Sequence, residues 1–438
     1  MGSTDPLNWS SVVLDAAPDH ARQALRRSML DLAGVAVAGA RTELSQIVRD
    51  HAALQFGGTG ARLMLDGRRV SAAGAAFAGG MTIDAMDAHD GLKPVKGHIG
   101  CGVFPAALAF AQAESLDLTS VFDLTLLGYE LGARAGLALH STAPDYHTSG
   151  AWVAVAIAGM GARALGLTAE QTAHALGIAE YHGPRSQMMR CIDHPTMVKD
   201  GSGWGAMAGV TAAYLARAGF TGAPALTVTT AQVADIWEDL GTRWYVSEQY
   251  FKPQPVCRWA QPAITAALAL QAAHGLEASD IARVDVTTFH EAVRLATAHP
   301  TSTEAAQYSL PFPVAAALVS GQVGPEQIDG PGLLDDRAQA LAGRVHLHEA
   351  EAFNAAFPAR RFAQVEITVQ NGRQFRTDPM EAPGDPEAPL TDGELLDKFE
   401  AYADPLGAAR KRAIKAALWH GEGTLRQVVE ALCMPIEC

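Results

Sequence analysis

Acid–base side chains gather in one short stretch of this chain, residues 87–98, which read DAHDGLKPVKGH. The stretch contains two carboxylates, two imidazoles and two ammoniums, and alanine-rich apolar segments flank it. Charged groups in such surroundings destabilise a fold unless they meet one another or a ligand. Imidazoles and carboxylates exchange protons, and ammoniums hold negative charge, so the stretch predicts proton transfer on a small anion.

Three other segments combine polar side chains with turn-forming residues: 145–150 (DYHTSG), 185–203 (RSQMMRCIDHPTMVKDGSG) and 251–259 (FKPQPVCRW). The four segments share an excess of cations, which are Lys93, Lys96, Arg185, Arg190, Lys199, Lys252 and Arg258. If the segments converge, they form a basic site in a chain whose formal net charge is −14. Such a site fits a small molecule with two or three carboxylates. It would also stabilise the charge left when a proton α to a carboxylate is removed.

Each of these residues also has a plainer interpretation. His98 and His147, taken singly, are typical of hydrogen-bonded structural histidines. The aspartates and histidines of residues 87–98 offer the ligand types of a divalent metal site, although their spacing matches no HExxH or CxxC motif. Lys199 is either a surface lysine or, because it precedes a glycine-rich turn and a predicted helix start, part of an anion site. Cys257 has no adjacent partner that would make it a nucleophile.

The composition indicates a globular protein with room for two domains. Of the 438 residues, 48% are hydrophobic and 18% are charged, which excludes a disordered chain. The acidic balance argues against nucleic acid as a partner. The stretch 1–6 lacks the basic and apolar regions of a signal peptide, and no apolar run is long enough to span a membrane. The five scattered cysteines form no CxxC pair, so we expect reduced thiols, no structural zinc and a cytoplasmic location.

Helical periodicity dominates from Ala17 to about Leu240. Apolar residues recur at three- and four-residue intervals in residues 22–40, 103–113, 121–139, 150–165, 169–179 and 205–218. Thr119 and Thr168 each precede one of these segments and are predicted helix starts. Residues 61–65 and 69–71 are predicted to form a small hairpin.

The pattern changes after Lys252. Residues 262–274 still predict a helix. Alternating apolar and polar residues then favour strands at 281–289, 345–347, 362–370 and, after an Asn-Gly turn, 373–376.

A proline-rich connector, residues 382–390, precedes the last part of the chain. Residues 392–403 and 407–432 return to helical periodicity. We therefore predict a mainly α fold with two domains. These are a helical domain, residues 1–252 completed by residues 391–438, and a smaller α+β domain, residues 253–390.

Taken in order, the polar segments resemble the MmgE/PrpD family, which includes 2-methylcitrate dehydratase, cis-aconitate decarboxylase and iminodisuccinate epimerase. The strongest matches are residues 84–106, 147–167, 197–222 and 251–268, and residues 308–313 and 390–399 are further landmarks. The similarity runs from about residue 10 to residue 430. No single match is decisive, and their order over this length carries the resemblance.

The resemblance implies a larger all-helical domain, a smaller α+β lid domain, a homodimer and an active site between the domains. It implies no metal and no organic cofactor. By motif, Asp87, His98, His147, Lys199 and Lys252 would line the active site, with the two histidines as proton-transfer groups. The two lysines would hold substrate carboxylates or stabilise developing charge. Four more residues are candidates for substrate binding, which are Lys96, Asp90, Arg258 and Phe312.

This chain departs from the family pattern at four places. It has His89-Asp90-Gly91 where family decarboxylases and dehydratases often have Asp-Asp-Thr. One extra residue separates this motif from His98. Cys257 stands where cis-aconitate decarboxylases carry a histidine, and Gln261 stands where many relatives have one. These departures disfavour a decarboxylase.

The resulting hypothesis is an enzyme that removes a proton α to a carboxylate of a small di- or tricarboxylic acid. A hydro-lyase similar to 2-methylcitrate dehydratase comes first, and an epimerase similar to iminodisuccinate epimerase comes second. A cis-aconitate-type decarboxylase follows. The alternatives from other classes are a metal-dependent hydrolase that uses the Asp/His cluster, and a small-acid binding protein without turnover.

Overall fold

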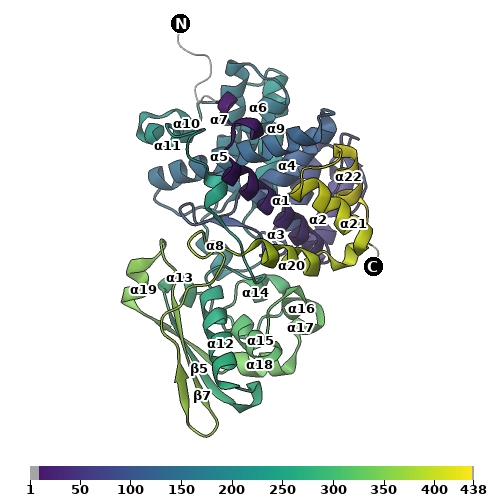
Figure 1. The fold of residues 1–438 in the computed structure, drawn as a ribbon. Coiled ribbons are helices and arrows are strands. Elements are labelled where there is room, and N and C mark those ends of the chain that lie inside the picture. Colours follow the sequence, from purple (N-terminus) through teal and green to yellow (C-terminus); the bar gives the residue numbers. More distant parts are fainter. Residues whose placement is uncertain (1–8, 437–438) are drawn as a thin grey trace.

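Helices form one lobe of the molecule, and a four-stranded sheet with its own helices forms the other (Figure 1). The computed structural model describes residues 9–436, so the expectation for residues 1–6 lies outside the described residues, as does Cys438. The main helices of the first lobe are α1 (Asp19–Gly39), α2 (Glu43–Gln55), α3 (Ala72–Asp84), α4 (Gly100–Ala113), α5 (Leu118–Thr142), α6 (Gly150–Ala164), α7 (Ala169–His182) and α9 (Ser202–Arg217). The predicted mainly α fold with a smaller α+β part is confirmed.

Small residues let α6 and α9 touch backbone to backbone. A Cβ added to Gly205 would lie 2.4 Å from the Gly150 carbonyl oxygen, and one added to Gly161 would lie 2.4 Å from the Ala213 Cβ. Only glycine allows this approach, because both distances are well inside van der Waals contact. The starts of the two helices therefore lie together, and Gly150 N donates to the Asp200 carbonyl at 3.1 Å.

The helix starts follow side-chain capping, and one predicted start is wrong. Thr168 begins α7 with a capping box to Gln171, as predicted. Helix α5 begins after Asp117 rather than Thr119, because Asp117 Oδ1 accepts from the Ser120 backbone N–H at 2.8 Å. A carboxylate satisfies the free N–H groups of the first turn, so Thr119 falls inside the helix.

The larger sheet has the strand order β6-β5-β7-β8. Its strands are β5 (Ile281–Thr288), β6 (Val345–Glu349), β7 (Ala363–Val369) and β8 (Gln374–Arg376), which confirms the predicted strands. β5 runs parallel to β6 and antiparallel to β7, and the β7–β8 turn passes through Gly372 at φ +81°. Helix α12 (Gln261–His274) packs against β7.

Short helices make up the rest of this lobe, and the sequence pattern did not predict them. They are α13 (His290–Val293), α14 (Thr303–Gln307), α15 (Pro311–Ser320), α16 (Pro325–Ile328), α17 (Gly330–Leu333), α18 (Asp336–Ala342) and α19 (Glu351–Ala356). Most span one or two turns, which is too short for helical periodicity to show. α15 packs against both α12 and α18.

The C-terminal helices return to the first lobe. α20 (Asp392–Tyr402) packs on α1, and α22 (Leu425–Cys433) packs on α4. Residues 407–432, predicted as one helical stretch, divide into α21 (Gly407–Ile414), a π-helical turn (Lys415–Trp419) and α22. The break has a backbone cause, because Gly421 and Gly423 have φ of +74° and +97°.

Two small strand pairs complete the described fold. β1 (Ala61–Arg62) and β2 (Arg69–Val70) form the predicted hairpin. β3 (Gly91–Leu92) pairs with β4 (Gln249–Tyr250) and joins segments more than 150 residues apart, with Gly91 opposite Tyr250. The remaining helices are α8 (Met189–Asp193), α10 (Leu226–Thr229) and α11 (Ala234–Trp237). Within residues 9–436, no helix has the length and apolar character needed to cross a membrane.

Candidate active site

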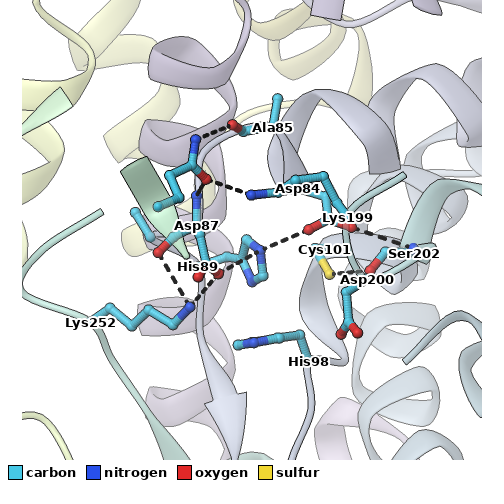
Figure 2. Close-up of polar contacts among 12 residues, drawn as sticks. Asp84, Ala85, Asp87, His89, His98, Cys101, Lys199, Asp200, Ser202 and Lys252 are labelled. Carbon is cyan, nitrogen blue, oxygen red and sulfur yellow. Dashed lines mark hydrogen bonds and ion pairs between the residues drawn. The ribbon is translucent and has the colours of Figure 1, made fainter. Parts of the chain in front are cut away.

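The centre of the site is a buried ion pair between Asp87 and Lys252 (Figure 2). Asp87 lies in the turn after α3, and Lys252 follows β4 by two residues, so the β3–β4 pairing brings them together. Lys252 Nζ donates to the Asp87 carboxylate and, at 3.2 Å, to the Asp87 carbonyl oxygen. Burial alone would raise the pKa of Asp87, but the Lys252 and Lys199 ammoniums outweigh burial and hold that pKa well below its ordinary value. Both partners therefore stay charged.

His98 lies beside this ion pair with one ring nitrogen fixed. Its Nδ1 donates to the Asp90 carbonyl oxygen at 2.6 Å, because a carbonyl can only accept. Burial, together with the charges of Lys252 and His89, lowers the pKa of His98 well below its ordinary value. The ring is therefore neutral at physiological pH, and its Nε2 carries a lone pair. A buried neutral imidazole of this kind is suited to accept a proton.

His89 extends the buried polar cluster toward the start of α9. Its Nε2 lies 3.4 Å from Asp84 Oδ1, and its ring meets that of His98 edge to face at 4.4 Å between centroids. Asp84 Oδ2 accepts from the backbone N–H of Ser202, the first residue of α9, at 3.5 Å. A carboxylate of the chain thus already occupies this helix N-terminus.

Lys199 is the second ammonium of the site, and it has no carboxylate partner. Its Nζ donates to Gln307 Oε1 at 2.5 Å and lies 4.7 Å from the Tyr308 ring centroid. Gln307 Oε1 also accepts from the Asp87 backbone N–H at 2.8 Å, so α14 of the α+β lobe contacts both charged residues. Lys199 is 1% exposed, and no acidic group of residues 9–436 lies within ion-pair distance of its Nζ. Its φ of +49° is strained for a side-chain-bearing residue, and such strain clusters at functional sites.

Asp200 supports His98 through Ser149. The Asp200 carboxyl shares a hydrogen bond with the Ser149 hydroxyl and accepts from the Ser149 backbone N–H at 3.2 Å. The Ser149 oxygen in turn accepts from the His98 backbone N–H at 2.8 Å. Burial, with the nearby charge of Asp84, raises the pKa of Asp200 to about 8. Asp200 is therefore protonated at neutral pH.

Asp200→Asn is expected to make the protein relatively more stable as pH rises. A carboxyl whose folded pKa of about 8 exceeds its ordinary 3.8 contributes stability below pH 4 that is lost on the way to pH 8. The amide mimics the protonated carboxyl and does not titrate. Urea unfolding at pH 5, 6, 7 and 8 measures the free energy of unfolding of both proteins. The variant's value minus that of the wild type should increase by up to about 1.4 kcal/mol per pH unit. Parallel pH profiles would show that Asp200 is already ionised.

His147 and Lys96 lie at the rim of this cluster. His147 is half-buried, its Nδ1 donates to the Asp145 carbonyl oxygen at 2.7 Å, and its backbone N–H donates to His140 Nε2 at 3.2 Å. Lys96 has φ +52°, and its Nζ lies 4.5 Å from the Tyr146 ring centroid. Burial lowers the pKa of Lys96. No hydrogen bond between described residues joins His147 to His98, although Ser149, two residues from His147, bonds the His98 backbone.

The other substrate-binding candidates make contacts within the protein. Asp90 Oδ2 accepts from the Tyr129 hydroxyl at 2.5 Å, and burial raises the Asp90 pKa to about 6. Arg258 pairs with Asp385 at 3.0 Å and donates to carbonyl oxygens of the proline-rich connector. Phe312 is fully buried near the start of α15. The structure thus brings Asp87, His98, Lys199 and Lys252 together, and Asp90 and Arg258 lie beside them, in contact with His98 and Tyr250 respectively. Phe312 is a core residue of the α+β lobe.

The cluster of Asp87, His89 and His98 also offers metal ligands. One ligand atom each from Asp87, His89 and His98 lies within 4.8 Å of the other two. The Lys252 ammonium, however, already neutralises Asp87, and His98 Nδ1 is committed to the Asp90 carbonyl. A divalent cation beside Asp87 would be repelled by Lys252, so the donor set fits an ammonium better than a metal.

Comparison with known families agrees with this geometry. Models of the MmgE/PrpD N-terminal domain and the MmgE/PrpD C-terminal domain match residues 9–238 and residues 255–420. The chain belongs to the MmgE/PrpD family. A comparison with curated proteins gave no match. Membership in the MmgE/PrpD family supports a dehydratase- or epimerase-like enzyme and does not specify the substrate or the reaction.

Tyr250 limits the side chain that position 91 can carry. A Cβ added to Gly91 would lie 2.5 Å from the Tyr250 hydroxyl oxygen. The same Cβ would lie 2.9 Å from His98 Nδ1. The Tyr250 ring therefore occupies the space that a side chain at Gly91 would need.

Gly91→Ala is expected to lower kcat about 10-fold or more, because the new methyl group must displace either the Tyr250 ring or the His98 ring. Steady-state kinetics together with the melting temperature check this. Gly57→Ala is the matched control, since a Cβ there meets nothing within 4 Å. Unchanged kinetics in the Gly91 variant would mean that the Tyr250 and His98 rings can move without affecting catalysis.

Sequence reasoning missed several residues that shape this MmgE/PrpD site. Ser149 and Asp200 lie inside segments that were singled out, and their polar types were the available signal. Tyr250 lies one residue before such a segment. Gln307 and Arg361 belong to no motif, because both reach the site from the distant α+β lobe.

Proposed function

We propose that this protein is a cofactor-independent MmgE/PrpD-type enzyme that removes a proton α to a carboxylate of a small di- or tricarboxylic acid. The observation that carries the proposal is the buried group of His98, Lys199 and Lys252. It combines a neutral imidazole with two ammoniums, and Lys199 pairs with no carboxylate of the described chain. A buried, unpaired ammonium favours an anionic ligand, because the ligand supplies the missing counter-charge.

The chemistry follows from these positions. Lys199 binds the carboxylate next to the reacting carbon, and His98 Nε2 takes the α proton. The electron pair of the broken C–H bond moves into that carboxylate, where the Lys199 and Lys252 ammoniums stabilise the additional negative charge. Asp87 keeps Lys252 protonated and in place. The Asp90 carbonyl fixes the His98 tautomer that leaves Nε2 free.

The fate of the carbanion decides the reaction class. In a hydro-lyase similar to 2-methylcitrate dehydratase, the electron pair expels a β-hydroxyl group as water after a second acid protonates it. In an epimerase similar to iminodisuccinate epimerase, a second acid returns a proton to the opposite face. We propose the hydro-lyase, with His147 as the second acid, since His147 lies on the segment that also bonds the His98 backbone through Ser149.

Proton exchange in D₂O tests the proposal. The protein is incubated with citrate, 2-methylcitrate, cis-aconitate and iminodisuccinate, and ¹H NMR follows loss of the α-proton signal and formation of product. Elimination supports the hydro-lyase, and exchange with inversion supports the epimerase. Loss of activity after exhaustive chelation would favour a metal-dependent hydrolase instead. Binding without exchange or product for any acid would leave a non-catalytic binding protein.

We also propose that the enzyme is a cytoplasmic homodimer, as its family implies. Large apolar side chains remain exposed on and beside helices α7, α9 and α10, which are Tyr181, Trp204, Leu215, Phe220 and Leu226. Exposed apolar residues of this size are typical of interfaces. Analytical ultracentrifugation of the purified protein tests the dimer, and a monomer at micromolar concentration would contradict it.

A further inference from the structure

Arg361 is a buried cation without a counter-charge. It lies between α19 and β7 in the α+β lobe and is 3% exposed. Its guanidinium Nε and Nη1 have no hydrogen-bond partner, and no acidic side chain of residues 9–436 forms an ion pair with it. Its neighbour Arg360, by contrast, is exposed and pairs with Glu381. A buried charge of this kind destabilises the free protein, so its presence points to a ligand that neutralises it.

The surroundings of Arg361 place it at the active site. The guanidinium carbon lies 5.4 Å from the Tyr250 ring centroid, and the Tyr250 ring is 6.2 Å from that of His98. Tyr250 is also the residue that fills the space beside Gly91. Arg361 therefore approaches the proton-transfer group from the α+β lobe, while Lys199 and Lys252 approach it from other segments.

The electrostatic neighbours of Arg361 come from both lobes. Burial raises the pKa of Cys257 to about 12, and the positive charges of Lys252 and Arg361 both oppose that rise. Burial lowers the pKa of Lys96, and the charge of Arg361 adds to this effect. The guanidinium charge thus acts on groups of both lobes, Cys257 beside Lys252 and Lys96.

We propose that Arg361 binds a second carboxylate of the substrate, distinct from the carboxylate that Lys199 holds beside the reacting carbon. This assignment rests on the proposed function and names the residue that holds the second carboxylate of those di- or tricarboxylic acids. The planar guanidinium presents parallel N–H donors that match the two oxygens of a carboxylate. Because Arg361 belongs to the α+β lobe and His98 to the helical lobe, a bound polycarboxylate bridges the two lobes.

Binding of an unreactive polycarboxylate tests the assignment without turnover. The probes are tricarballylate, which has three carboxylates and no hydroxyl, and butyrate, which has one. The variants are Arg361→Met and Arg361→Lys, with Arg360→Met as the matched control on the exposed neighbour. Isothermal titration measures tricarballylate affinity, and the ligand-induced rise in melting temperature compares both acids.

Arg361→Met is expected to weaken tricarballylate binding about 10- to 100-fold, the range for a lost charge-assisted carboxylate contact, and to leave the butyrate response unchanged. Arg361→Lys should lose less, and Arg360→Met should match the wild type. The free Arg361→Met protein should melt no lower than the wild type, because an unpaired buried charge has been removed.

Equal tricarballylate affinity in Arg361→Met and the wild type would overturn the proposal. An equal decrease in the melting-temperature response to tricarballylate and to butyrate would also overturn it, as would the absence of tricarballylate binding by the wild type. Should Arg361→Met unfold, the Arg361→Lys titration decides in the same way. If no acid reacts in D₂O while Arg361→Met still binds tricarballylate more weakly than the wild type, the proposed reaction is wrong and the carboxylate-binding role of Arg361 is supported.

Discussion

His98→Gln is expected to lower kcat about 100-fold or more, the scale of a lost proton-transfer group. Glutamine can still hydrogen-bond the Asp90 carbonyl through its amide, but it cannot accept a proton at neutral pH. Affinity for the substrate should stay within a few-fold, because Lys199 and Lys252 remain. Steady-state kinetics and α-proton exchange in D₂O measure the two effects separately. Full exchange in His98→Gln would show that another group is the base.

His147→Gln separates the two proton-transfer roles. If His147 is the acid that assists departure of the hydroxyl group, product formation should fall about 100-fold while α-proton exchange continues. His98→Gln should lose both. His147 is half-buried at the rim, so its replacement should leave the melting temperature close to that of the wild type. Loss of exchange in both variants would instead indicate two bases on opposite faces, as an epimerase requires.

Elements with a long, regular pattern could be predicted from the sequence, and short ones could not. β7 alternates strictly because one face packs on α12, and β5 alternates in the same way from Val284 onward, so the bounds of both strands were nearly right. Most of the helices between residues 303 and 342 are too short to show a period. The start of α5 was misplaced because Asp117 and Thr119 are both capping residues, and only the hydrogen bond to Ser120 distinguishes them.

For the candidate site, the polar segments could be recognised from the sequence, but their arrangement in space could not. The segments that carry Asp87, His98, Lys199 and Lys252 were recognisable because each concentrates polar residues between apolar helices. The convergence of Asp87 and His98 with Lys252 depends on the two-residue strands β3 and β4, which have no sequence signature of their own. Arg361 has no flanking motif, and its significance appears only when burial and the missing counter-charge are seen together.

Removing either partner of the Asp87–Lys252 pair is expected to destabilise the protein by unequal amounts. Asp87→Asn leaves the Lys252 ammonium buried without its carboxylate and removes the negative charge nearest to Lys199, and it should lower the free energy of unfolding by about 3–5 kcal/mol. Lys252→Met leaves the Asp87 carboxylate, which still feels the Lys199 charge, so its effect should be smaller. Urea unfolding of both variants measures the difference. Arg426→Ala, which removes an exposed ion pair with Glu430, is the control and should change little.

The double variant Asp87→Asn/Lys252→Met distinguishes stability from catalysis. Because neither charge is then buried alone, the double variant should be more stable than the sum of the single effects predicts, and more stable than Asp87→Asn itself. Its kcat should nevertheless stay at least about 100-fold below the wild type, since the second ammonium that stabilises the carbanion is gone. A stable and active double variant would show that the pair only holds the fold together. A stable and inactive one would assign the Lys252 charge to the reaction, with Asp87 as the residue that keeps this charge in place.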